Sequence, residues 1–89
     1  MIEAFERDAT CHLGALRSAI ASGDTKRLRE EAHALKGASC TIGAQVMGGI
    51  CQQLENLGIA QNAEGAAELI VRLEREFDRV KNQVVEDGL

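Results

Sequence analysis

Apolar residues recur every three or four positions in four windows of the chain, and no window shows a sustained alternation with a period of two. Such spacing places the apolar side chains along one side of an α-helix. The stripe positions are Ile2, Phe5, Ala9, Leu13, Leu16 and Ile20; Leu28, Ala32, Leu35, Ser39 and Ile42; Val46, Met47, Ile50, Leu54 and Leu57; and Ala66, Leu69, Ile70, Leu73, Phe77, Val80 and Val84. The pattern predicts four amphipathic helices.

Short breaks separate these helices. Gly23 is the expected terminator of the first helix, and Asp24 is the expected N-cap of the second. The second helix should end near Gly43, Gly58 should close the third, and the polar residues 61–62 should lead to the fourth. Helices joined by short links pack antiparallel, so the expected fold class is all-α, an up-down-up-down four-helix bundle.

Length and composition agree with this fold. The chain has 89 residues, which is enough for one small core, and it lacks proline, tryptophan and tyrosine. We therefore expect residues 1–89 to form a single bundle domain, with a tight connection over Thr41–Ala44 between the second and third helices.

The charge balance limits the classes of partner. The formal net charge is −4, whereas nucleic acids and anionic membranes attract basic surfaces. No apolar run is long enough to cross a membrane, and the N-terminus lacks the pattern of a signal peptide. We expect no nucleic-acid partner and no membrane insertion by this segment.

The cysteines favour neither a disulfide framework nor a metal site. The chain has three cysteines, Cys11, Cys40 and Cys51, and no two of them form a CxxC motif. An odd number without such a motif fits a reducing intracellular compartment. Their spacing, with His12 directly after Cys11, is unlike that of zinc ligands. We expect all three to be small, buried or half-buried apolar residues, and a thiol or metal redox protein is the weakest alternative.

The stretch AHALKG at residues 32–37 carries the candidate chemistry. His33 falls roughly 130° from the centre of its helix's core stripe, on the solvent side. Lys36 and Gly37 lie one turn further along the same face, although glycine lowers helix stability by about 1 kcal/mol relative to alanine. A histidine can act as a nucleophile, a lysine can stabilise an anion, and a glycine can let a partner approach closely. An ordinary solvated helix face remains the alternative.

A second candidate group lies on the third helix. Glu55 and Gln52 fall on a flank from which they could reach a neighbouring helix. A carboxylate against one imidazole nitrogen would hold the proton there and leave the other nitrogen nucleophilic. For Glu55, an ordinary surface position is an equally open alternative. His12 borders the apolar stripe of the first helix, and we expect it to pack there without a functional role.

Residues 32–55, AHALKGASCTIGAQVMGGICQQLE, closely resemble the signature of the histidine-containing phosphotransfer (HPt) domains of bacterial and fungal phosphorelays. In that signature, AH-x-LKG is followed by a small residue, by a glycine a few positions later, and by an apolar stretch that ends in LE or a relative. The preceding ASGDTKRLREE is also similar to the family's usual lead-in. The family fold is a four-helix bundle of this size, so the resemblance extends loosely over the whole chain.

The resemblance implies a role for each matching residue. His33 would be the phosphoacceptor, Lys36 would stabilise the phosphoryl group, and Glu55 would hydrogen-bond to His33 or to its phosphoryl group. Gly43 matches the glycine of the turn between helices. Gly37 and Gln52 match positions that line the site in the family. Arg29 and Cys40 lie on the same helix face as His33, so the expected partner docking surface is Arg29, Gly37, Cys40 and Gln52.

The resemblance also implies a phosphocarrier without kinase activity of its own. Such a carrier takes a phosphoryl group from a receiver-domain phospho-aspartate and passes it to an aspartate of a response regulator. The expected partners are receiver domains of a hybrid sensor kinase or of response regulators. The resemblance implies no cofactor on this chain, with Mg²⁺ expected on the receiver.

The resemblance leaves the context of the chain open. We expect a cytoplasmic monomer, and we lean towards the C-terminal domain of a larger, membrane-anchored sensor kinase. A structural or adaptor bundle that binds signalling proteins without being phosphorylated is the alternative function.

Overall fold

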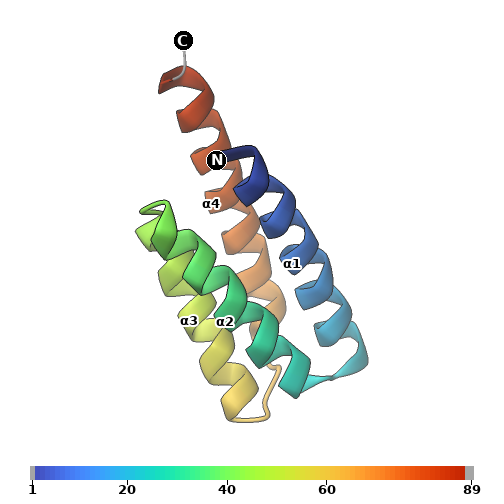
Figure 1. Cartoon of the computed structure of the whole chain (residues 1–89). Coiled ribbons are helices and arrows are strands. Elements are labelled where there is room, and N and C mark those ends of the chain that lie inside the picture. The colour runs from blue at the N-terminus through green and yellow to red at the C-terminus, as the bar shows by residue number, and fades with distance from the viewer. Residues whose placement is uncertain (1, 88–89) are drawn as a thin grey trace.

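The computed structural model describes the backbone of residues 2–87 and the side chains of residues 4–82. The helices are α1 (Ile2–Ser22), α2 (Thr25–Thr41), α3 (Gln45–Ile59) and α4 (Ala66–Asp87). Each helix packs against its neighbour in sequence, and α4 also packs against α1, which closes an up-down-up-down bundle (Figure 1). The predicted fold class is therefore confirmed.

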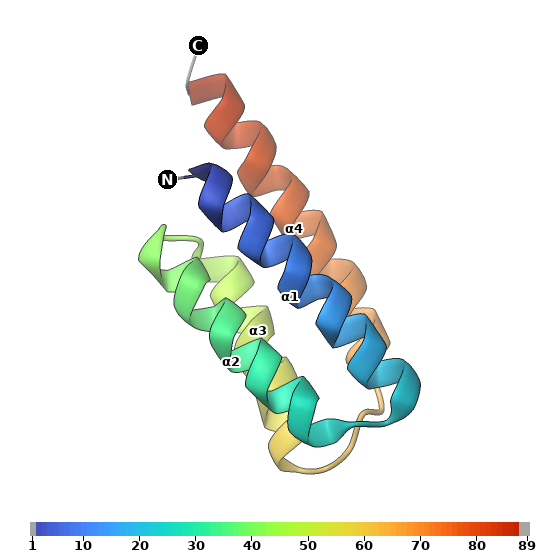
Figure 2. The same ribbon diagram turned by 45° about the vertical axis from the view of Figure 1, so that its right-hand side comes forward.

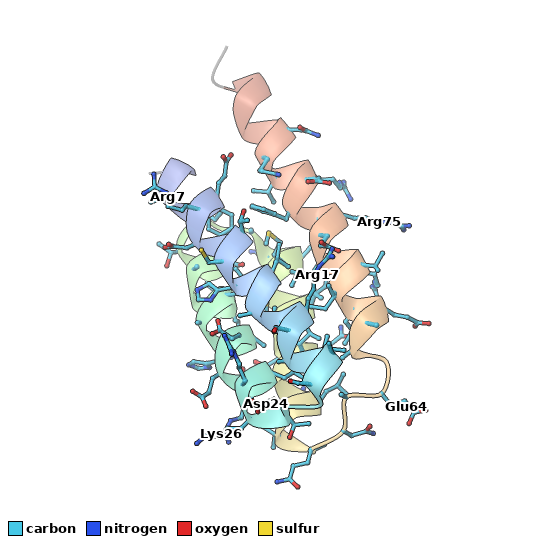
Figure 3. All side chains as sticks on the ribbon, turned by 90° about the vertical axis from the view of Figure 1, so that its right-hand side faces the viewer. Arg7, Arg17, Asp24, Lys26, Glu64 and Arg75 are labelled. Atoms are coloured by element: carbon cyan, nitrogen blue, oxygen red, sulfur yellow. The ribbon has the colours of Figure 1, made fainter. Side chains whose placement is uncertain are left out.

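The helices differ in length, so the bundle is uneven at one end. The C-terminal part of α4 extends beyond the turn that joins α2 to α3 (Figure 2). Where α1 meets α4, the Arg17 guanidinium of α1 pairs with the Glu74 carboxylate of α4. Figure 3 shows Arg17 on the face where these two helices meet. None of the described helices is both long and apolar enough to span a membrane.

One cluster of buried side chains fills the space between the helices. Its members are Phe5, Ala9, Leu13, Leu16, Ala19, Leu28, Ala32, Leu35, Met47, Ile50, Cys51, Leu54, Ala66, Ile70, Leu73 and Phe77. The rings of Phe5 and Phe77 meet edge to face with their centroids 5.9 Å apart, a favoured aromatic geometry that ties α1 to α4. The side chains of Ile2 and Val84, also predicted for the core, lie outside the described residues.

Two predicted core positions are wrong. Val46 is 59% exposed and Ile42 is 36% exposed. Helix α3 begins at Gln45, and it buries Met47 from its first turn. Val46 precedes Met47 directly and therefore points about 100° away from the core. Ile42 follows the last residue of α2 as its C-cap, where the helical stripe no longer applies.

The predicted breaks on either side of α2 are confirmed. The Asp24 carboxylate accepts a hydrogen bond from the Arg27 backbone N–H at 3.1 Å, as an N-cap does. Gly43 follows α2 with a φ of 79°, a left-handed conformation that glycine adopts readily. The Ala44 N–H then donates to the Ser39 carbonyl, which closes the end of the helix.

Gly58 does not terminate α3, contrary to the prediction. The helix continues to Ile59, and Gly58 is buried against α2. A Cβ at residue 58 would lie 2.7 Å from the Arg29 Cβ and 2.8 Å from the Thr25 carbonyl oxygen. The glycine therefore permits a close approach of α2 and α3, and this approach sets the spacing of the two helices that carry the candidate site.

Candidate functional site

The exposed face of α2 and the adjoining flank of α3 bring the predicted residues together. The buried side chains Ala32 and Leu35 anchor α2 in the core, so His33 between them points to solvent with 68% of its side chain exposed. Its Nδ1 lies 3.0 Å from Oε2 of Glu55 on α3. The structure therefore places Glu55 beside His33, where the helical pattern alone had left an ordinary surface position equally open.

Lys36 joins the same carboxylate from the next turn of α2. Its Nζ donates to Oε1 of Glu55 at 3.0 Å and to Oε1 of Gln52 at 2.7 Å. Each oxygen of Glu55 thus has its own partner, Lys36 on one and His33 on the other. Glu55 is 14% exposed, so the carboxylate that contacts the exposed imidazole is itself largely buried.

The charge of Glu55 determines which ring nitrogen of His33 faces it as a hydrogen-bond donor. The hydrogen bond from Lys36, supported by the one from His33, holds the pKa of Glu55 below the ordinary glutamate value, although burial acts in the opposite direction. An ionised carboxylate only accepts hydrogen bonds, so His33 must donate from Nδ1–H. In the neutral ring, Nε2 then carries a free lone pair and can act as a nucleophile.

The residues predicted to dock a partner lie around this group. Gly37 is exposed, and a Cβ built there would meet nothing within 4 Å, so the surface beside His33 is open. Arg29 and Cys40 are exposed on α2, one turn before and two turns after His33. Gln52 differs from these, because its carbonyl is engaged with Lys36. The structure places it within the charged group as well as beside the docking surface.

Sequence reasoning missed Asn56. The Gln52 amide donates from Nε2 to Oδ1 of Asn56 at 3.0 Å, one helical turn further along α3. The available signal was the spacing of four residues between two amide side chains, which places them on one face of a helix. Polar pairs at that spacing are common on exposed helix faces, so the signal did not single this pair out.

The second histidine forms a separate pair. His12 Nδ1 on α1 lies 2.6 Å from Oε2 of Glu31 on α2. The two side chains are 27% and 25% exposed, so the pair is half-buried at the contact of α1 with α2. The prediction that His12 packs beside the core is consistent with this position, but its carboxylate partner was not predicted.

The cysteines do not form a site in the described part of the chain. Cys51 is buried, as expected, and burial raises the pKa of its thiol to about 12, with the nearby Cys40 acting in the same direction. Cys11 and Cys40 are exposed, so the expectation that all three would be at least half-buried is wrong for these two. Among the described residues, no three His, Cys, Asp or Glu side chains are grouped as metal ligands.

Comparison with known proteins identifies the family of the chain. The model of the Hpt domain family matches residues 1–83. The chain belongs to the Hpt domain family. In structure it is similar to histidine-containing phosphotransfer protein B (HptB) from Pseudomonas aeruginosa, with 33% sequence identity and a TM-score of 0.92 over 96% of this chain and 74% of that one. No match was found among the curated proteins.

Membership of the family defines the general activity. An Hpt domain is a histidine phosphotransfer carrier in phosphorelay signalling, and it is not a kinase. Its partners are the receiver domains and response regulators of the phosphorelay. The chain is therefore a phosphocarrier, and the remaining question is which of its residues carry and guide the phosphoryl group.

Proposed function

We propose that His33 is the phosphoacceptor and that Nε2 is the atom that bonds to phosphorus. The observation that carries this proposal is the carboxylate of Glu55, which accepts from His33 with one oxygen and from Lys36 with the other. This contact holds the proton on Nδ1 and leaves Nε2 unprotonated, exposed and one helical turn from a cation. Each property serves nucleophilic attack on an anionic phosphoryl group.

The transfer step balances without any further reagent. The lone pair of Nε2 attacks the phosphorus of the receiver's aspartyl phosphate, and the bond between that phosphorus and the carboxylate oxygen breaks. The aspartate leaves as a carboxylate, while the imidazole keeps its proton on Nδ1 and gains the N–P bond. Onward transfer reverses these bond changes, with the carboxylate of an acceptor aspartate as the nucleophile.

Glu55 and Lys36 have complementary parts in this step. The ring is cationic when it holds both the phosphoryl group on Nε2 and the proton on Nδ1, and the anionic Glu55 stabilises that cation. A cationic ring is also a better leaving group in the onward step. Lys36 is close enough to turn towards the arriving phosphoryl oxygens while Glu55 remains paired with His33.

The partner docks on the exposed face of α2. Gly37 leaves room for a receiver domain to reach His33, and Arg29 and Cys40 extend the contact along the helix. The receivers belong to a hybrid sensor kinase, to a response regulator, or to both. We expect Mg²⁺ on the receiver, and a cytoplasmic monomeric carrier formed by residues 1–89 as a single domain, alone or as part of a larger kinase.

Labelling tests the assignment to His33. A receiver domain carrying labelled aspartyl phosphate should transfer the label to this chain, and the label should be acid-labile and alkali-stable. The variant His33→Gln should lose it completely. The matched control is His12→Gln, which removes the other of the two histidines and should be labelled like the parent chain. Label that persists in His33→Gln contradicts the assignment, and failure of every receiver to label the parent favours the adaptor alternative.

A further inference from the structure

A chain of hydrogen bonds leads from Lys36 along α3 to a residue outside the group described above. The Lys36 ammonium donates to Oε1 of Gln52, and Nε2 of Gln52 donates to Oδ1 of Asn56. Asn56 is exposed and lies in the last turns of α3, where its backbone carbonyl accepts from the Ala60 N–H. The side chain of Asn56 therefore projects from a regular, hydrogen-bonded turn of α3.

The orientation of the Gln52 amide matters because its two ends are chemically opposite. A lysine ammonium only donates hydrogen bonds, so it is attracted to the amide oxygen and repelled by the amide NH₂. The terminal torsion of glutamine has a broad, roughly two-fold profile, so both orientations are sterically available. The orientation that faces the oxygen to Lys36 leaves the NH₂ in need of an acceptor.

We propose that Asn56 is a positioning residue that fixes the Gln52 amide and thereby holds Lys36 beside His33. The carboxylate of Glu55 accepts from His33 and Lys36, while the Gln52 NH₂ donates away from Glu55, towards Asn56. The Oδ1 of Asn56 supplies the acceptor instead. This proposal rests on the proposed role of Lys36 in phosphoryl transfer.

Loss of Asn56 would act on the lysine in a defined way. Without an acceptor for its NH₂, the Gln52 amide rotates towards water, and Lys36 loses its shortest hydrogen bond. The ammonium then depends on Glu55 alone, so it lies nearer that carboxylate and less readily meets a phosphoryl group on Nε2. The imidazole keeps its own contact with Glu55, so the nucleophile itself is unchanged.

Two substitutions at Asn56 separate positioning from helix stability. Asn56→Leu keeps a similar shape and favours the helix, but it removes the acceptor, so transfer to and from His33 should slow by about fivefold. Asn56→Asp keeps an acceptor oxygen and should stay within about twofold of the parent rate. The control is Gln53→Leu, the same kind of exchange at an exposed residue of α3, which should transfer like the parent.

A third substitution tests whether Asn56 acts through Gln52. In Gln52→Glu the carboxylate presents an accepting oxygen in either orientation, so no partner is needed to orient it. Adding Asn56→Leu to Gln52→Glu should then have no further effect, although the same change slows the parent chain. Equal slowing in both backgrounds would overturn the proposal.

The lysine can also be observed without phosphate. In the unphosphorylated protein, the nitrogen and proton NMR signal of the Lys36 ammonium should shift and exchange faster in Asn56→Leu, and should be unaffected by Asn56→Leu in the Gln52→Glu background. A Lys36 signal identical in the parent and Asn56→Leu overturns the positioning role, whatever the transfer assay gives. A shifted signal in a protein that no receiver labels supports the positioning role and contradicts the proposed function, so the two failures are distinguishable.

Discussion

His33 and His12 each place Nδ1 against a glutamate of a neighbouring helix, Glu55 for one and Glu31 for the other. The contacts join the same kinds of atom, at 2.6 Å for His12 and at 3.0 Å for His33, and their surroundings differ. His33 is 68% exposed over a carboxylate that is 14% exposed, whereas both members of the other pair are about equally half-buried. Lys36 shares the carboxylate of Glu55, and among the described residues no lysine or arginine forms an ion pair with Glu31.

This difference shows what turns a histidine–glutamate pair into a candidate site. The pairing itself orients an imidazole and links two helices, which both pairs do. A ring that faces water can also meet a partner, and a lysine on the same carboxylate can be released to an anion that arrives. The second pair lacks these two properties, so we assign it to the packing of α1 on α2.

The largest effect is expected when the contact between His33 and Glu55 is removed. Glu55→Ala removes the acceptor for both His33 and Lys36, so the proton of the imidazole is no longer held on Nδ1. Losing a hydrogen bond to a charged group should slow transfer by between about tenfold and a hundredfold. The measurement is the rate of phosphoryl transfer from a receiver at neutral pH.

The matched change in the other pair is Glu31→Ala. It should transfer at the parent rate, because Glu31 touches His12 and not the site. If both alanine variants slow transfer equally, the distinction between the two pairs is wrong. Glu55→Gln should fall between the parent and Glu55→Ala, since glutamine keeps one accepting oxygen.

The second-largest effect is expected when α3 is pushed away from α2, because this disturbs the contact of His33 with Glu55 and leaves that of His12 with its glutamate in place. Gly58→Ala places a methyl group against the backbone and Cβ of α2, where there is no room for it, and this overpacking should lower the free energy of unfolding by about 1–3 kcal/mol. Because α2 and α3 move apart, transfer should slow as well, while the contact of α1 with α2 is kept. Urea denaturation and the transfer assay measure the two effects.

Gly37 provides the contrasting glycine. A Cβ there meets nothing within 4 Å, so Gly37→Ala should raise the free energy of unfolding by up to about 1 kcal/mol through its better helix propensity. A Gly58→Ala variant with the same urea midpoint as the parent would show that the close approach of the helices is not needed.

Gly37 and Gly58 also show which features of the fold the sequence pattern does not predict. Periodicity placed the helices and identified the Asp24 cap and the Gly43 turn, because those signals are local. A glycine near the end of a predicted helix is usually a terminator, and Gly58 was interpreted in that way. Gly58 is a contact point because α2 passes close to it. The hydrophobic pattern of α3 alone does not show where α2 runs.

The candidate site was likewise predictable within one helix and not between helices. His33, Lys36 and Gly37 lie on one face of one helix, so their grouping follows from spacing alone. Glu55 was ambiguous by spacing, because its approach to His33 depends on how α3 is rotated against α2, and the family resemblance supplied that pairing. Asn56 was missed because its effect passes through Gln52, whose contact with Lys36 also crosses between helices.

The smallest effect concerns the pH dependence of stability, and it isolates Lys36, the residue that distinguishes the two pairs. Because the pKa of Glu55 is lowered in the folded protein, chiefly by Lys36, the unfolded chain binds the proton more readily. Glu55 therefore contributes stability above the ordinary glutamate pKa, and that contribution is lost as the pH falls through its lowered, folded-state pKa.

The parent should be more stable than Glu55→Gln at neutral pH, and the difference should shrink progressively below about pH 4. In a Lys36→Met background, urea titrations across the same range should give a smaller difference at neutral pH, because the main cause of the shift is gone. A difference of unchanged size in that background would mean that the lysine does not stabilise the carboxylate, and the two histidine–glutamate pairs would then differ in exposure alone.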